Sequence, residues 1–234
     1  EGRLDAEQAG VALAEGMVIA NEPFDQFKGA ARGNGAAKAS DRLRVQVPAA
    51  CRPGFQRGLT VGAGLGTARE LAAAPPNIAN PKYMVDRCRA LAKETGLKCS
   101  VIDEKRAGEL NMGGLLAVGR AGSTPPALIA LEWPGKQPGR KKQSKKTSAK
   151  KSTGRSASAA AKPLMLVGKA ITFDTGGYSL KPSSGMKGMK YDKCGGTAVI
   201  GAMEAIARLN LSQRVVGLIP CAENMIDETA YRVD

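Results

Sequence analysis

The sequence predicts an α/β protein, built as a three-layer α-β-α sandwich around a mainly parallel central sheet. Three observations indicate this fold. Hydrophobic residues make up 43% of the 234 residues, enough for a packed core. Short apolar runs such as ALIALEW (127–133) and PLMLVG (163–168) are typical of buried strands. Helical patterns alternate with these runs, as parallel sheets with helices on their faces require.

The first half of the chain contains mostly helical patterns, whose ends proline and glycine mark. The segment from Lys82 to Thr95 has an apolar stripe, follows Pro81 and stops at Gly96. Pro75 must end the helix before it, because proline lacks a donor and clashes with the preceding turn. In chain order we expect a helix at 5–20, a strand at 42–47, helices at 58–74 and 82–95, a strand at 97–102 and a short helix ending at Leu110.

The second half alternates strands with one long helix. The apolar runs 127–133 and 163–168 predict two neighbouring strands, and Val215 to Cys221 predicts a third. A glycine-rich irregular turn is expected at 174–191 and a helix at about 195–208. Functional loops of such folds gather at the carboxyl ends of strands. The loop after the strand that begins at residue 164 is therefore where chemistry is expected.

Composition excludes several classes of protein. The chain contains no histidine, which removes Ser-His and Cys-His catalysis and every histidine metal site. Its five cysteines are widely spaced without a CxxC pair, which favours a reducing cytoplasm over a disulfide framework. No apolar run approaches the roughly 20 residues that cross a bilayer, and the first residues do not resemble a secretory signal. We expect a cytoplasmic protein.

The net charge of +14 is concentrated in one segment. Ten basic and no acidic residues lie between Lys136 and Lys162, so the rest of the chain carries only +4. The segment 137–162 is rich in Lys, Ser and Ala, and we expect a disordered insertion within one fold. An alternative function is nonspecific nucleic-acid binding through this basic tract. The absence of interleaved aromatic residues makes nucleic acid an unfavoured partner.

The segment from Val167 to Gly196 combines five lysines and two aspartates with seven glycines. Asp174 and Asp192 are hard oxygen ligands of the kind that divalent metals take, and Lys169 and Lys181 are close enough in sequence to share a site. On spacing alone an ordinary alternative has about equal weight: Asp192 as the N-cap of a helix, Asp174 as a turn residue and the lysines solvated.

Longer motifs in the same region resemble a known family. VGKAITFDTGG, followed by SLK, MKYDKCGGTAVIGAMEAI and VVGLIPCAENM, is similar to the core of the leucyl aminopeptidase (cytosol aminopeptidase) family of two-metal metallopeptidases. Upstream, ELAAAPPNIANPKYM and LNMGGLLAVGRAGSTPPALIALEW follow in the order of that family. The resemblance implies an incomplete catalytic domain at 75–234 with the basic insertion 137–162, a connecting helix at 51–74 and a remnant of an amino-terminal domain at 1–50.

The resemblance also implies roles for single residues. Lys169 would bind one metal as a neutral amine, Asp174 would bridge two metals, and Asp192 would be a further ligand. Lys181 would be the catalytic lysine that stabilises the oxyanion. Met189 and Met186 would line the pocket for the first side chain of the substrate. The implied reaction releases leucine-like amino-terminal residues from peptides, through two divalent cations (Mn²⁺ or Zn²⁺) and a bridging water.

Two departures from the family pattern limit this expectation: the family's amino-terminal domain is mostly missing, and so is its second ligand motif. The family's second ligand motif, Asn-Thr-Asp-Ala-Glu-Gly-Arg, is not found before Asp234. In the family this motif supplies the two remaining carboxylate ligands and an arginine near a bicarbonate. Three ligands of five bind two metals poorly, so we expect a fragment with little activity by itself. The complete enzyme is implied to be a homohexamer. A catalytically inactive relative kept for assembly is another alternative.

Overall fold

The computed structural model describes residues 4–21, 44–136 and 162–233. In chain order the elements are α1 (Ala6–Asn21), η2 (Ala49–Cys51), α2 (Arg52–Ala73), α3 (Pro81–Thr95), β1 (Lys98–Ile102), α4 (Glu104–Glu109), α5 (Gly113–Gly119), β2 (Ala127–Trp133), β3 (Leu164–Val167), β4 (Ala170–Asp174), α6 (Ser183–Met186), η3 (Met189–Lys193), α7 (Cys194–Arg208) and β5 (Val215–Asn224). The basic insertion lies outside the described residues, except for Lys162.

Most predicted elements form close to their expected bounds. The helix α3 shows why, because Asn80 caps it by accepting a hydrogen bond from the Tyr83 backbone N–H and Pro81 occupies its first turn. Gly96 ends it in the left-handed conformation, at φ 78°. The differences include the following three. Residues 44–47 of the expected first strand are irregular, α5 forms in a glycine-rich segment without a predicted helix, and β4 is a separate strand after β3.

The α/β class is confirmed, with a five-stranded sheet that is mixed in direction. The order is β1-β2-β5-β3, and β4 also pairs with β5. Both β3 and β4 run parallel to β5, whereas β1 pairs antiparallel with β2 and β2 antiparallel with β5. The expectation of a mainly parallel sheet therefore holds only for the half containing β3, β4 and β5. That half carries the predicted site residues.

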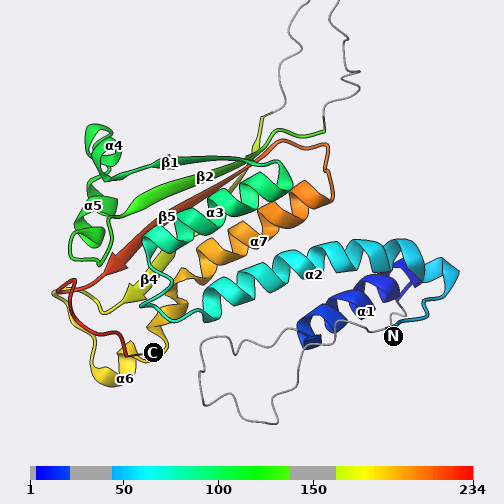
Figure 1. Ribbon diagram of the computed structural model, residues 1–234, viewed down its shortest axis with the longest axis horizontal. Helices are drawn as coiled ribbons and strands as arrows, with labels where there is room; N and C mark the ends of the chain where they lie inside the picture. Colours follow the sequence, from blue (N-terminus) through cyan, green and yellow to red (C-terminus); the bar gives the residue numbers. More distant parts are fainter. Residues whose placement is uncertain (1–3, 22–43, 137–161, 234) are drawn as a thin grey trace, which may run out of the picture.

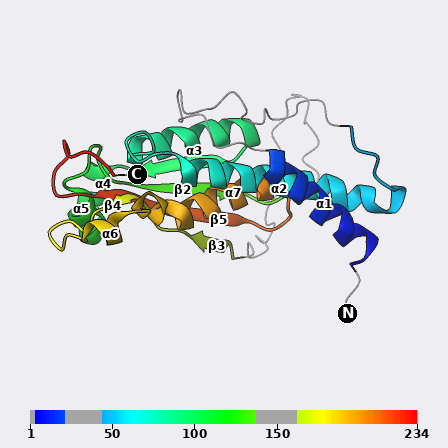
Figure 2. The same ribbon diagram turned by 90° about the horizontal axis from the view of Figure 1, so that it is seen from below.

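One face of the sheet carries the core. Figures 1 and 2 show α3 and α7 lying along the sheet, with α2 and then α1 further from it and α4 and α5 at one end. Inward side chains of β2 and β5, including Ile129, Leu131 and Ile219, are fully buried in one cluster with Met84 of α3 and Met203 of α7. Alternate residues of the same strands point to the other face and are only half-buried. The strand period of two thus decides which residues enter the core.

Glycines allow the helices to pack closely. A Cβ on Gly201 of α7 would lie 2.2 Å from the carbonyl oxygen of Gly64 in α2, and one on Gly64 would lie 2.4 Å from the Gly201 oxygen. A Cβ on Gly54 of α2 would lie 1.9 Å from the Glu7 oxygen of α1. The glycines of α2 that the sequence places inside a helix are therefore sites of helix contact.

We predict opposite effects for one substitution at two helical glycines. Gly201→Ala is expected to lower the free energy of unfolding by about 1–3 kcal/mol, because the new methyl group displaces α2 from α7. Gly16→Ala is the matched control, since a Cβ at Gly16 meets no atom within 4 Å and alanine favours a helix by about 0.5–1 kcal/mol. Urea unfolding measures both. Equal free energies of unfolding for Gly201→Ala and wild type would contradict the close packing.

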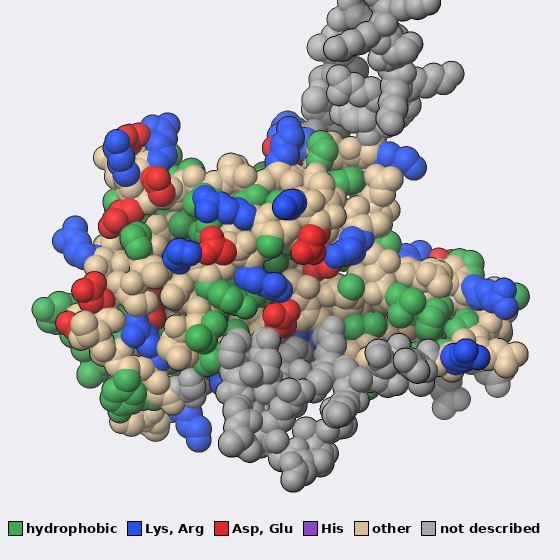
Figure 3. Space-filling view, in the orientation of Figure 1, with side chains coloured by type: hydrophobic (Ala, Val, Ile, Leu, Met, Phe, Trp, Pro, Cys, Tyr) green, Lys and Arg blue, Asp and Glu red, His purple; other side chains and the backbone are tan. Residues whose placement is uncertain are grey.

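The surface of the described residues carries mixed charge. Figure 3 shows lysine and arginine side chains interspersed with acidic ones over the face that α2 and α3 form. Ion pairs on α3 include Lys82 with Asp86 at 2.6 Å and Arg87 with Glu70 at 3.2 Å. All five cysteines are free. Among the described helices, none has the length and hydropathy that a bilayer span requires.

Candidate metal centre

The predicted site residues lie on β4 and on the turns next to it. Lys169 immediately precedes β4, and Asp174 is its last residue. Asp192 belongs to η3, which packs against β4, and Lys181 lies in the loop between them. Because β4 and β5 are parallel, Asp174 and Asn224 end their strands at the same edge of the sheet and are paired in register. This edge is where an α/β sheet usually binds ligands.

Lys169 and Asp192 form the first pair. The Lys169 Nζ lies 2.7 Å from the Asp192 Oδ2. This oxygen is buried and accepts no hydrogen bond of ordinary geometry from the described groups, so its contact with the ammonium is an ion pair without an aligned hydrogen bond. The N-cap of α7 is Lys193, without a side-chain cap. The alternative of Asp192 as a helix N-cap is therefore wrong.

Glycines bring the two members of this pair together. A Cβ on Gly168 would lie 2.2 Å from the carbonyl oxygen of Gly195, and one on Gly196 would lie 2.6 Å from the Ala170 Cβ. The Gly196 N–H donates to the Lys169 carbonyl at 2.6 Å. The start of β4 therefore contacts the start of α7 at a distance that only glycine permits, which places Lys169 beside the turn that carries Asp192.

Lys181 and Asp174 form the second pair. The Lys181 Nζ contacts the Asp174 Oδ2 and also donates to the Asp174 carbonyl at 3.2 Å. The Asp174 Oδ1 accepts from the Gly176 N–H at 3.0 Å, so the alternative of a turn residue is correct in part. Burial raises the pKa of Asp174, but the hydrogen bonds from Lys181, Gly176 and Asn224 outweigh it and hold the pKa below the ordinary 3.8. Asp174 is therefore ionised at neutral pH.

The sequence analysis missed Asn224 as a site residue. Its Nδ2 donates to the Asp174 Oδ1 at 2.7 Å, and its carbonyl accepts from the Thr175 N–H at 2.9 Å and the Thr175 Oγ1 at 2.8 Å. A Cβ on Gly177, which has φ 60°, would lie 2.8 Å from the Asn224 Oδ1. The available signal was the polar Glu-Asn pair directly after the apolar run of β5.

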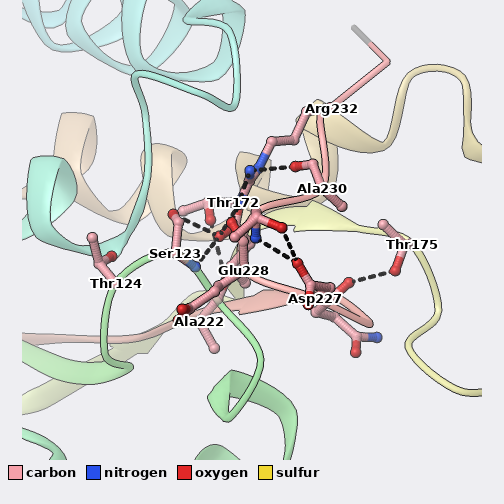
Figure 4. A network of polar contacts seen from close by, with 12 residues as sticks. Ser123, Thr124, Thr172, Thr175, Ala222, Asp227, Glu228, Ala230 and Arg232 are labelled. Atoms are coloured by element: carbon pink, nitrogen blue, oxygen red, sulfur yellow. Dashed lines mark hydrogen bonds and ion pairs between the residues drawn. The ribbon is translucent and has the colours of Figure 1, made fainter.

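A buried ion pair also escaped the sequence analysis. Glu223 is fully buried and binds Arg232 through both oxygens, from Nε and Nη2, each at 2.8 Å. Its Oε2 accepts from the Ser123 N–H at 2.8 Å and the Ser123 Oγ at 2.9 Å. Figure 4 shows Ser123 and Arg232 approaching this end of the sheet from different segments, with Thr175 nearby. The pair thus fixes the end of β5, where Asn224 lies.

Lys193 supports the turn that carries Asp192. Its side chain is fully buried, and its Nζ donates to the carbonyl of Ala74 at 3.0 Å and to that of Lys190 at 2.6 Å. A buried ammonium is costly unless it is hydrogen-bonded, so these contacts hold η3 against the end of α2. The predicted pocket residues Met186 and Met189 are half-buried, in α6 and at the start of η3. Their part in a substrate pocket stays a prediction.

The fold is that of an α/β protein, and the two lysine–aspartate pairs lie on and beside β4 of its mixed sheet. Comparison with known proteins assigns it further, because the model of the cytosol aminopeptidase family, catalytic domain, matches residues 66–234. The chain belongs to the cytosol aminopeptidase family. This confirms the family that the motifs predicted.

Individual relatives agree with this assignment. The chain is 43% identical over 184 residues to a probable cytosol aminopeptidase of Nitrosospira multiformis, covering 78% of this chain and 31% of the relative. It is 41% identical over 222 residues to the cytosol aminopeptidase of Pseudomonas aeruginosa, covering 94% of this chain and 40% of the relative. The chain therefore spans between about a third and two fifths of the length of these curated relatives.

Solved structures show the same fold. The leucyl aminopeptidase of Trypanosoma cruzi, in its apo form, matches with a TM-score of 0.74 and 29% identity, covering 98% of this chain and 40% of that one. The bottromycin maturation enzyme BotP in complex with Mn matches with a TM-score of 0.73 and 30% identity. The match covers 97% of this chain and 42% of that one.

Proposed function

We propose that the protein is a metal-dependent aminopeptidase that removes leucine-like residues from peptides with a free amino terminus. The observation that carries the proposal is the pair of carboxylates, Asp174 at the end of β4 and Asp192 in η3, which packs against β4, each with a lysine ammonium against its Oδ2. Membership of the cytosol aminopeptidase family supports the same reaction. Two divalent cations, Mn²⁺ or Zn²⁺, are the proposed cofactors.

The residues present fit a cation site. The Asp192 Oδ2 is buried and accepts no aligned hydrogen bond from the described groups. It therefore has a lone pair with which it could bind a cation. The Asp174 Oδ2 is balanced by the ammonium of Lys181. Lys169, Asp174 and Asp192 would hold the cations, with the Lys169 amine uncharged. When bound, the cations supply Lewis acidity that activates water and polarises a carbonyl.

The remaining chemistry belongs to the side chains. The Lys181 ammonium would turn from the Asp174 Oδ2 toward the carbonyl oxygen of the substrate, where it stabilises the negative charge that develops. Asp174 and Asp192 supply negative charge that attracts the cations, and they orient them. Met186 and Met189 would contact the first side chain of the substrate, since unbranched thioethers adapt to leucine-like shapes.

These ligands form one half of the proposed centre. Two carboxylates and one amine offer fewer ligand positions than two divalent cations need. We therefore propose that residues 1–234 alone bind Mn²⁺ weakly and turn over little substrate. A homohexamer and a bicarbonate in the complete enzyme are proposed from the family resemblance.

Leucine p-nitroanilide with Mn²⁺ tests the activity. A family-length polypeptide containing this sequence is expected to release p-nitroaniline, to lose this activity with EDTA and to regain it with added Mn²⁺. Lys181→Met is expected to reduce turnover by about 10²–10³-fold, the usual effect of removing an oxyanion donor. Lys187→Met, at an exposed lysine of the same loop, is the matched control and should not change it.

Two outcomes separate the parts of this proposal. Undiminished turnover by Lys181→Met would remove that residue from the reaction. Family-level turnover by residues 1–234 alone would contradict the half-centre while leaving the aminopeptidase activity in place.

A further inference from the structure

We propose that Asn224 is a positioning residue that commits one oxygen of Asp174 to the protein and leaves the other for a cation. This inference rests on the proposed function, in which Asp174 is a metal ligand. It follows from the contacts of the two Asp174 oxygens, which differ in kind. Oδ1 accepts from two uncharged amide donors, Asn224 Nδ2 at 2.7 Å and the Gly176 N–H at 3.0 Å, whereas Oδ2 faces the Lys181 ammonium.

The two amide donors fill Oδ1. Each carboxylate oxygen has two lone-pair positions, so Oδ1 has none left after Asn224 and Gly176 have bound. Among the described residues, the partner given for Oδ2 is the Lys181 ammonium, at the flexible end of a side chain that can turn away when a cation binds. Partners that orient a ligand in this way normally change metal affinity by about 10–100-fold when they are removed.

Asn224 is itself held from three directions. Its carbonyl accepts two hydrogen bonds from Thr175, the residue after Asp174. Its Oδ1 lies 2.8 Å from the position of a Cβ on Gly177, so the absence of a side chain there makes room for the amide. The residue before it, Glu223, is fixed by Arg232 and Ser123. These contacts fix the backbone of Asn224, and Nδ2 faces Asp174 because an ionised carboxylate accepts from the amide nitrogen and not from the amide oxygen.

The ion pair of Glu223 with Arg232 connects Asn224, the next residue, to segments that are distant in sequence. Ser123 lies just before β2, and Arg232 follows β5 by eight residues and also donates to the Ala230 carbonyl at 2.6 Å. Figure 4 shows these residues meeting around the end of the sheet. The orientation of Asp174 therefore depends on residues that never touch the cation. These contacts assign Asn224 a role beyond ending the strand.

Titration of the family-length protein with Mn²⁺, followed by electron paramagnetic resonance, tests the proposal. Asn224→Leu keeps the shape of the side chain but donates no hydrogen bond, and Asn224→Ala removes it. Each is expected to raise the dissociation constant for Mn²⁺ by about 10–100-fold. Turnover of leucine p-nitroanilide should return toward the wild-type rate in excess Mn²⁺, which a merely unfolded fraction would not do. Asn77→Ala, at an exposed asparagine, is the control and should bind as wild type does.

The outcomes are distinguishable. If wild type binds Mn²⁺ and Asn224→Leu binds it equally well, the positioning role is overturned and the proposed function stands. If wild type itself neither binds Mn²⁺ nor hydrolyses the anilide, the proposed function fails and this inference with it. If Asn224→Ala does not fold, as its circular dichroism spectrum would show, Asn224→Leu decides the question.

Discussion

Replacing Asp174 with asparagine is expected to raise the dissociation constant for Mn²⁺ by more than about 100-fold, beyond the usual effect of losing a supporting partner. The substitution keeps the volume of the side chain but removes its negative charge, and it replaces one oxygen with a hydrogen-bond donor. The Lys181 ammonium then loses its carboxylate. Activity with leucine p-nitroanilide is expected to fall at least as far, because the cations supply the electrophile.

Asp86→Asn provides the matched control. Asp86 is an exposed aspartate of α3 whose ion pair with Lys82 lies on the surface, so its loss should leave Mn²⁺ binding unchanged. Calorimetric titration of both variants with Mn²⁺, at equal folded fraction, gives the comparison. Wild-type affinity in Asp174→Asn would exclude Asp174 as a ligand.

Replacing Arg232 with methionine is expected to lower the free energy of unfolding by about 3–5 kcal/mol at neutral pH. The reason is that Glu223 is fully buried and would lose its bidentate partner, so the buried carboxyl would carry an uncompensated charge or take up a proton, each at a cost. Arg89→Met is the control, because Arg89 is an exposed residue 3.9 Å from Asp86, and such pairs contribute less than about 1 kcal/mol. Urea unfolding measures both variants. A similar small loss in both would show that the buried pair contributes no more than a surface one.

The deficit of Arg232→Met should depend on pH. Burial raises the pKa of Glu223, but the hydrogen bonds from Arg232 and Ser123 outweigh this and hold it below the ordinary 4.5 in the folded protein. The stability that the ionised carboxylate contributes is therefore complete above about pH 4.5, and it is lost as the pH falls through the lower folded pKa. The difference in unfolding free energy between wild type and variant should narrow in acid. A constant difference down to pH 2 would contradict this linkage.

The sequence determined the longer helices, the α/β class and the family. Asn80, Pro81 and Gly96 bound α3 because capping and the left-handed conformation are local properties of the chain, readable from adjacent residues. The motif from Val167 to Gly196 was sufficient to name the family, and it contains Lys169, Asp174, Lys181 and Asp192. What it left open was whether Asp192 is a cap or a ligand and whether the lysines are solvated.

Tertiary structure excluded the N-cap and showed which carboxylates the two lysines contact, because both points depend on residues that are distant in sequence. The role of Asp192 as a ligand stays a prediction. Lys169 meets Asp192 across 23 residues only where Gly168 and Gly195 let two backbones touch. Asn224 meets Asp174 across 50 residues because β4 and β5 are parallel and end together. Glu223 meets Ser123 across 100 residues, and the antiparallel direction of β1 and β2 was likewise invisible to local patterns. Local preferences determine the secondary structure of each segment. Strand pairing and burial determine which distant side chains form ion pairs and hydrogen bonds with one another.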